Sequence, residues 1–582
     1  MSNKWRSNAV KGVMAVAITA AAFGVAQNAS AEAQVTAKSV PCDPYAKYDC
    51  LDSYLGDGFW NRLTNYYKLE MGKDAAPADP NAPPSRSEDF PPAAMTTPPM
   101  PFTEWPNGGN PGIGVTTPNM VDSPFMNAIA NTTVGQWMID NHIQAYGWAN
   151  AGFNFSTNNT HGGNAPAAYD YSPNAPVLNQ IVEYVERLPD TVQKEHNDWG
   201  FRLNMIYGED YRYTTSYGIF SGQLMNKNFQ YGFDAVMAYF DYFIPSVAQG
   251  LNIRVGRYIA IPDIEAQLAP NNYMYSHSIT YGYDNYTNEG ILGTLAVDKN
   301  WQVQAGVTAG TDTTLQHMWT TNTINCSVLY PCKGATYGAN GLSTQTQGML
   351  QDPGAKPSFT GAIRWNSDDG KTSAQAVVNG LNSGQWGYNN LQWHGFTLYH
   401  TFDEHWHIST EFYNEFQKNV PNSQNAQVQQ IYSGTPGAGA GPQAPFSQFA
   451  YNAPNLAACG NVNALTCRAM ANGSVTYINY QIDPLNNLSF RPEFYWDMQG
   501  QRTGAGNQPL TGNGPGTPVY GNGSAVGSGA IYRNYAFGWQ HWFSPQIEVR
   551  PEVAWYSASA PVFNNGQTRY QTVWSGDIIW HW

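Results

Sequence analysis

The residues of this chain that could do chemistry are charged side chains at alternate positions of short, otherwise apolar segments. Side chains on a strand point alternately to opposite faces, so these charges would share one face and the apolar residues the other. We predict that a common lumen is lined by Arg202, Arg254, Arg364, Glu411, Glu415, Arg491, Glu493, Glu548, Arg550 and Glu552. Opposed charges across a narrow lumen select solutes by charge and size. The alternative is that several of them pair with neighbours and stiffen the wall.

Other chemistry is weakly represented. His405, His407 and Glu411 share one strand face and could hold a metal, but they follow the turn Asp403-Glu404, which favours a solvated rim. The chain contains no Gly-x4-Gly-Lys-Ser/Thr, Gly-x-Ser-x-Gly or His-Glu-x-x-His motif. We therefore predict no catalytic residue, no metal site and no cofactor.

The cysteines fall into three close pairs in polar, loop-like segments: Cys42 and Cys50, Cys326 and Cys332, and Cys459 and Cys467. Local disulfides in an oxidising compartment are the favoured interpretation. Metal binding is the alternative, although no pair has the two-residue spacing of a zinc or redox motif. Spacing alone does not prove the pairing.

The amino terminus indicates export. Lys4, Arg6 and Lys11 precede an apolar run over 12–26, and Ala29-Ser30-Ala31 offers small residues at a cleavage site. We predict a signal peptide over residues 1–31. Its removal takes away three positive charges, so the net charge changes from −14 to −17, which disfavours nucleic-acid binding.

The composition and the carboxyl terminus together predict membrane strands. Charged residues are only 12% of the chain and aromatic residues 14%. The segment 574–582 alternates in polarity and ends on Trp580 and Trp582, a pattern typical of a transmembrane β-barrel and of the insertion signal of its last strand. No segment after the signal peptide has the 18 or so consecutive apolar residues of a membrane helix.

The chain divides by composition into three parts. Residues 32–135 form a Pro-rich extension, predicted to be periplasmic or to enter the barrel, with one candidate helix near 59–71. From 136 to 582, two-residue alternation recurs, as in 199–207 and 547–555. We predict one antiparallel up-and-down outer-membrane β-barrel over 136–582.

Connection lengths orient this barrel. Short turns such as 298–300 and 367–370 fall on the side of the carboxyl terminus, and long stretches such as 311–357 fall on the other. The alternation of strand directions leaves about 16 strands and makes 259–286 an external or inward-folded loop. This loop carries Asp263, Glu265 and Asp284 and no basic residue, so we expect a mild cation preference where it narrows the lumen.

Several motifs resemble those of the OmpL-like β-barrel porins of the bacterial outer membrane. The resemblance runs over about 140–582 and is carried by the stretches 251–258, 263–265, 272–278 and 288–290, which read LNIRVGRY, DIE, NYMYSHS and NEG. The chain has Asp263-Ile264 where the family usually has Gly before the acidic residue. The resemblance implies an outer-membrane porin without catalytic residues.

The leading hypothesis is passive diffusion of small hydrophilic solutes through a water-filled lumen. One alternative is a structural or adhesion barrel with a plugged lumen and partner-binding loops. Another is an exported soluble carbohydrate-binding protein or glycosidase. The partners expected for the porin are outer-membrane lipid, the barrel-assembly machinery and small solutes, and no nucleic acid. The oligomeric state stays open, with a homotrimer as one option.

Overall fold

The computed structural model describes residues 51–71, 113 and 123–582. Gaps within the last range lie at 160–163, 165, 171, 217–219, 226–228, 261–263, 285, 320, 325, 330, 344–347, 352–355, 383–390, 434–456, 484, 504–528 and 545. The predicted signal peptide, the pair Cys42 and Cys50, and most of the Pro-rich segment lie outside the described residues.

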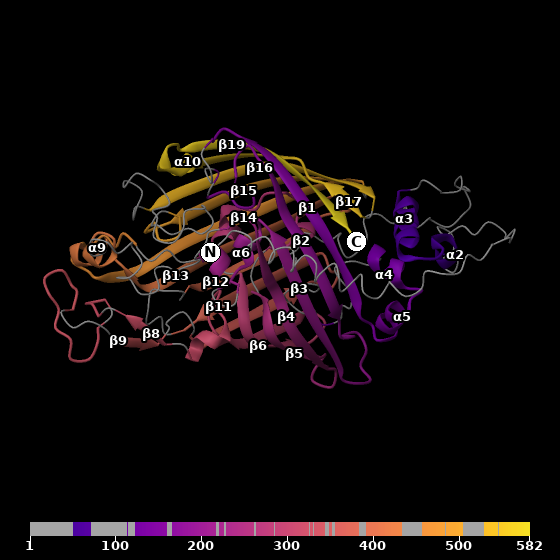
Figure 1. Ribbon diagram of the computed structural model, residues 1–582, viewed down its shortest axis with the longest axis horizontal. Coiled ribbons are helices and arrows are strands. Elements are labelled where there is room, and N and C mark those ends of the chain that lie inside the picture. Colours follow the sequence, from indigo (N-terminus) through magenta and orange to yellow (C-terminus); the bar gives the residue numbers. More distant parts are fainter. Residues whose placement is uncertain are drawn as a thin grey trace, which may run out of the picture. The chain divides into compact units, whose positions relative to one another are not determined.

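The described part of the chain from Gln144 onward forms one closed antiparallel barrel of 16 strands (Figure 1). This confirms the predicted fold class and strand number. The strands are β1 Gln144–Ser156, β2 Pro176–Arg187, β3 Asp198–Gly208, β4 Gly232–Ile244, β5 Leu251–Ile259, β6 Thr287–Ala296, β7 Trp301–Thr308, β10 Ser358–Asn366, β11 Thr372–Leu381, β12 Gln392–Thr401, β13 Trp406–Pro421, β14 Thr466–Asp483, β15 Asn486–Asp497, β16 Ala530–Ser544, β17 Ile547–Val549 with β18 Glu552–Ala558, and β19 Tyr570–His581.

The barrel closes between its first and last strands. β1 pairs antiparallel with β19 from Trp148↔His581 to Ser156↔Val573. Beyond this register, the backbone N–H of Trp582 donates to the carbonyl of Gly147 at 2.9 Å, and the reverse bond measures 3.1 Å. The carboxyl-terminal residue therefore completes the closure seam, as expected for the last strand of a barrel without free edges.

One predicted strand is broken in the structure. The alternating segment 547–555 was expected to be continuous, but β17 and β18 are separate and both pair with β16 and β19. The interruption falls at Arg550 and Pro551. Proline has no N–H to donate to the ladder, so a strand is commonly interrupted where it occurs.

Short and long connections segregate to opposite ends of the barrel, as predicted. The turn after β6, 297–300, is short, whereas the connection after β7, 309–357, is long and contains a two-stranded hairpin of β8 Thr321–Ile324 and β9 Gly348–Gln351. Disulfides join Cys326 to Cys332 and Cys459 to Cys467, which confirms both predicted pairs at the long-loop end.

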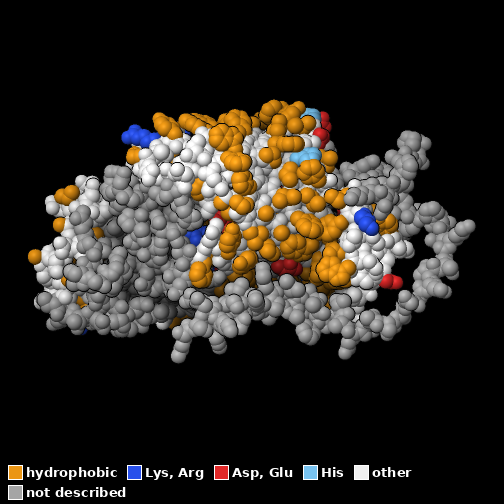
Figure 2. Space-filling model, turned by 45° about the horizontal axis from the view of Figure 1, so that its top comes forward, with side chains coloured by type: hydrophobic (Ala, Val, Ile, Leu, Met, Phe, Trp, Pro, Cys, Tyr) orange, Lys and Arg blue, Asp and Glu red, His pale blue; other side chains and the backbone are white. Residues whose placement is uncertain are grey.

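The outer face of the barrel is apolar. Figure 2 shows hydrophobic side chains in a broad band over one side of the barrel, with few charged groups among them. Near the short-turn end, each of several strands exposes an aromatic side chain by 40 to 61%. We call these residues the lower girdle: Trp199, Tyr242, Trp301, Trp406, Trp539, Phe543 and Trp580. Aromatic belts of this kind mark the membrane interface of outer-membrane barrels.

In the described residues before the first strand there are four helices: α2 Leu51–Leu55, α3 Phe59–Glu70, α4 Pro124–Ile129 and α5 Thr133–Asp140. The sequence predicted only α3. The side chains of Ser123 and Thr132 cap α4 and α5 by accepting from Met126 N and Gly135 N. In the described part of the chain, no helix has the length and apolar character needed to cross a membrane.

The other helices of the described chain are short and lie in connections between strands. They are α6 Tyr211–Thr214, α7 Gly222–Met225, η3 Ala269–Asn271, α8 Ile279–Gly282, η4 Leu315–Trp319, α9 Ala426–Ser433 and α10 Phe563–Gly566. Two of them, η3 and α8, belong to the connection between β5 and β6, which shapes the lumen.

Candidate functional site: the lumen and its inward loop

The interior face of the barrel carries the polar side chains that alternate with apolar ones along the strands. All ten side chains predicted to line a lumen point inward, and all but one of them are buried. Arg364 is the exception and is half-buried near the short-turn end of β10. The alternation of strand side chains is thus sufficient to place these charges inside. Their contact with a solute stays a prediction.

On the wall formed by β2 to β5, the predicted arginines pair with carboxylates of the neighbouring strand. Arg202 lies 2.5 Å from Glu186, and Arg254 lies 2.8 Å from Asp241. The guanidinium of Arg254 also stacks on Tyr239, with 3.5 Å between its central carbon and the ring centroid. These ion pairs largely cancel the charge of this wall, as the alternative interpretation expected for some residues.

The connection between β5 and β6 folds into the barrel. We call its described core, residues 264–284, the inward loop. Every residue of the inward loop is buried, which confirms that the segment lies inside rather than forming an open external loop. Asp263 lies outside the described residues. The polar groups of this segment must therefore find partners on the barrel wall.

Three wall carboxylates accept hydrogen bonds from backbone N–H groups of the inward loop. Glu411 on β13 accepts from Ile264 N at 2.9 Å. Glu552 on β18 accepts from Ser276 N at 2.9 Å and also from the Ser276 hydroxyl. The third, Glu493 on β15, binds the N–H of Thr280 at 2.5 Å. These charge-assisted bonds fix the loop to three strands of the wall, β13, β15 and β18.

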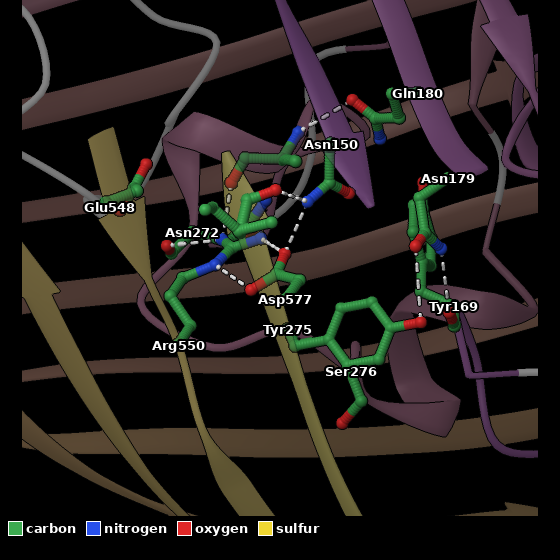
Figure 3. A network of polar contacts seen from close by, with 12 residues as sticks. Asn150, Tyr169, Asn179, Gln180, Asn272, Tyr275, Ser276, Glu548, Arg550 and Asp577 are labelled. Carbon is green, nitrogen blue, oxygen red and sulfur yellow. Dashed lines mark hydrogen bonds and ion pairs between the residues drawn. The ribbon is translucent and has the colours of Figure 1, made fainter. Parts of the chain in front are cut away.

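Two wall arginines donate to loop carbonyls. Arg491 Nη1 lies 2.5 Å from Ser276 O. Arg550 Nη1 donates to Ala269 O at 2.5 Å and to Asn272 O at 2.9 Å. Figure 3 shows Arg550 between Asn272 and Asp577, with Asn150 bonded to the same carboxylate at 2.7 Å. Half of the ten side chains predicted to line a lumen thus hold the loop, namely Glu411, Glu493, Glu552, Arg491 and Arg550.

Of the two acidic residues in the inward loop, Glu265 and Asp284, the first is compensated. Glu265 lies 3.5 Å from Arg491 and accepts from the Tyr477 hydroxyl at 2.7 Å and from Ser278 N at 2.9 Å. The expected cation preference rested partly on this carboxylate. Because Arg491 offsets its charge, Glu265 contributes little to a net negative field in the lumen.

The buried imidazole of His277 links two parts of the inward loop. His277 Nε2 donates to Ala266 O at 2.6 Å, and the ring stacks on Tyr169 with 3.6 Å between centroids. Burial holds the pKa of His277 well below its usual value. The side chain is therefore neutral and acts as a hydrogen-bond donor within the folded loop.

Glycines on the inner wall make room for loop side chains. A Cβ at Gly152 would lie 2.4 Å from Tyr275 Oη, and one at Gly473 would lie 2.6 Å from Thr280 Cγ2. At Gly538 the nearest atom would be Met274 Cε, at 2.9 Å. The loop therefore approaches the wall more closely than any larger residue at these positions would permit.

The inward loop also binds β2, and β2 in turn contacts the connection after β3. Gln180 Nε2 donates to Gln267 O at 3.0 Å, and its Oε1 accepts from Ala269 N at 3.1 Å. The same amide nitrogen lies 2.9 Å from Asp210, whose pKa is raised to about 8 by burial. Alternation in the sequence did not single out Gln180, because β2 departs from strict alternation here and buries both Asn179 and Gln180.

The three residues of the alternative metal site, His405, His407 and Glu411, bind other groups. His407 contacts the Tyr273 hydroxyl of the inward loop, and Glu411 binds Ile264 N. His405 instead lies at the turn, with Nδ1 2.7 Å from Gln481 O. The three side chains therefore have separate partners in the described structure.

The opposite arc of the wall is nearly uncharged. The interior-facing side chains of β7, β10 and β11 are amides, hydroxyls and small apolar groups apart from Arg364. Some interior side chains on this side are only half-buried, as on other strands near the short-turn end. The half-buried interior residues near the short-turn end of β7, β10, β12 and β13 are Gln302, Arg364, Tyr399, Thr401 and His407.

A cavity of about 380 Å³ lies at the short-turn end beside β1 to β3. Its lining includes Gln144, Glu186 and Asp198. Glu186 links this cavity to the interior, since it accepts from the Tyr146 hydroxyl at 2.7 Å and pairs with Arg202. The cavity is therefore polar and continuous with the charged wall.

Comparison with solved structures finds outer-membrane channels at low similarity. The outer membrane channel DcaP of Acinetobacter baumannii is 8% identical, with a TM-score of 0.39, over 76% of this chain and 97% of that one. The anion-selective porin of Comamonas acidovorans is 9% identical, with a TM-score of 0.40, over 76% and 99%. OmpT of Vibrio cholerae in its trimer form is 7% identical, with a TM-score of 0.36, over 76% and 99%.

No curated protein matches the sequence. A family model does match, over residues 142–581, and its description is "Putative beta-barrel porin-2, OmpL-like". The matched range begins two residues before β1 and ends with β19. The chain therefore belongs to the family of OmpL-like β-barrel porins, whose place is the outer membrane.

Proposed function

We propose that the protein lets small hydrophilic solutes diffuse passively across the outer membrane, through a lumen that the inward loop narrows. Family membership and the polar interior of a closed 16-strand barrel support this function. Barrels of 16 to 18 strands are wide enough to leave an aqueous channel.

The observation that carries the proposal is the asymmetry of the lumen. The charged wall residues that bind the inward loop lie on β13 to β19, whereas the interior-facing side chains of β7, β10 and β11 are uncharged apart from Arg364. We place the solute path between the loop and this nearly neutral arc, with Arg364 as the predicted pore-lining charge that a solute meets.

A second candidate is a barrel with a plugged lumen whose long external loops bind a partner. The complete burial of the inward loop favours it, because a segment held by Glu411, Glu493, Glu552, Arg491 and Arg550 cannot swing aside without breaking many buried polar contacts. Conductance separates the two functions, since a plugged barrel passes no ions.

Export and assembly of the chain are part of the proposal. We propose that residues 1–31 are removed as a signal peptide and that the assembly machinery reads Trp580 and Trp582. The apolar outer face supports contact with lipid. We propose no catalytic role for the chain, and we keep the homotrimer as the assembly to test.

The experiment is single-channel recording of the purified full chain in a planar lipid bilayer. Discrete conductance steps that scale with salt concentration support the diffusion channel. A correctly folded barrel that inserts without conductance supports the plugged alternative. Replacing Arg364 by Ala, in a channel that conducts, should change ion selectivity more than replacing the exposed Arg533.

A further inference from the structure

Helix α3 has two apolar faces. Its buried face places Tyr66 and Leu69, both with no exposed surface, within the helical group formed with α2 and α4. The other face carries Trp60 and Tyr67, which are seven residues apart on a helix with 3.6 residues per turn, and Met71, the C-cap residue, extends this stripe four residues further. Trp60 is 73% exposed and Met71 45% exposed.

This stripe is continuous with the outer face of the barrel. The rings of Tyr67 and Trp580 lie 5.6 Å apart in an edge-to-face arrangement, and the Tyr67 hydroxyl donates to the carbonyl of His581 at 2.5 Å. Trp580 is half-exposed and belongs to the lower girdle. Helix α3 therefore lies at the level where the lipid-facing band of the barrel ends.

The helical group is fixed at this level by further contacts. Arg62 of α3 donates to Asn127 O of α4 at 3.0 Å, and the Ser123 hydroxyl donates to Ala145 O of β1 at 3.0 Å. Figure 1 shows α3, α4 and α5 beside the end of the barrel that carries the carboxyl terminus. Helix α5, which ends shortly before β1, exposes Val134 by 59% and Trp137 by 56%.

We propose that α3 is an interfacial anchor, with Trp60 and Met71 inserted among the phospholipids of the periplasmic leaflet. A tryptophan and a tyrosine at the lipid headgroup level are typical of membrane interfaces. The flanking position Asn61 is exposed and polar, so the apolar surface is confined to a narrow stripe. This anchor does not depend on whether the lumen conducts.

The test uses the full chain in nanodiscs of phosphatidylethanolamine and phosphatidylglycerol. Trp60→p-benzoylphenylalanine introduces a photoreactive group on the stripe, and the same replacement at Asn61 probes the face about 100° away on the helix. Replacement of Trp301 in the lower girdle gives the lipid-facing reference. Heat-modifiable gel mobility verifies that each variant is folded.

Mass spectrometry measures the yield of phospholipid adduct at each position. We expect the yield at position 60 to approach that at position 301 and to be several-fold higher than that at position 61. Equal lipid yields at 60 and 61 would overturn the proposal. Adducts at position 60 that join two copies of the chain, in place of lipid, would overturn it as well and would assign the stripe to an interface between copies.

Discussion

Arg550 and Asp577 form a two-point ion pair inside the barrel, with Arg550 Nε 3.1 Å and Nη2 2.5 Å from the two carboxylate oxygens. The pair links the broken strand β17–β18 to β19, and the remaining guanidinium nitrogen holds two carbonyls of the inward loop. One buried arginine thus connects the closure of the barrel with the position of the segment that narrows its lumen.

Replacing Arg550 by Met should destabilise the barrel and release the loop. Removal of one partner of a buried ion pair costs about 3 to 5 kcal/mol, because the other charge stays buried without compensation. We expect a lower unfolding free energy in urea and a larger, noisier unitary conductance. Arg533→Met is the matched control, since Arg533 is exposed on the same sheet. Unchanged conductance in a folded Arg550→Met barrel would refute the anchoring role.

Adding a methyl group at Gly473 should push the inward loop away from β14. The new Cβ would lie 2.6 Å from Thr280 Cγ2, and such overpacking costs about 1 to 3 kcal/mol. We expect Gly473→Ala to change unitary conductance without loss of the barrel. Gly293→Ala is the control, because its Cβ would meet nothing closer than Ala305 O at 3.6 Å. Equal effects of the two variants would argue against the close approach.

Much of this architecture could be predicted from the sequence, for a physical reason. Alternate residues of a strand must face lipid and interior, so the pattern in 199–207 was sufficient to place Trp199 outside and Arg202 inside. The direction of successive strands also identified 259–286 as a loop. The interruption at Pro551 could have been expected from its missing N–H, but the alternation on both sides concealed it.

The partners of the interior charges could not be predicted. Glu411 and Ile264 are far apart in sequence, and their contact depends on how the loop docks after the barrel closes. Alternation assigns a side chain to a face and says nothing about what occupies that face. Helices α4 and α5 were missed for another reason: their caps, Ser123 and Thr132, lie at the edge of a Pro-rich segment that suggested extended chain.

Reduction of the two described disulfides should leave the barrel folded. Non-reduced peptide mapping by mass spectrometry should find Cys326 linked to Cys332 and Cys459 linked to Cys467. Because both bridges close small segments at the long-loop end, reduction should leave the heat-modifiable mobility intact. Loss of that mobility on reduction would show that a bridge supports the barrel itself. The pairing of Cys42 with Cys50 stays a prediction for the same experiment.

Removing Trp580 to Trp582 should impair assembly. The terminal residues complete the seam with β1, and the Trp582 indole donates to Glu183 at 3.0 Å across Gly147, where a Cβ would collide with both groups. We expect a marked loss of outer-membrane yield for the truncated chain. Trp582→Phe, which keeps an aromatic end, is the control and should retain most of the yield. Normal yield of the truncated chain would contradict the role of the seam.

The central claim is that a water-filled path runs between the inward loop and the neutral arc of β7, β10 and β11. Its most direct test is unitary conductance of the full chain in a planar bilayer, together with the reversal potential in a salt gradient. The account predicts discrete, salt-dependent steps with weak ion selectivity, because the described wall arginines Arg202, Arg254, Arg491 and Arg550 are paired with carboxylates. Absence of conductance from a folded, inserted barrel would contradict it.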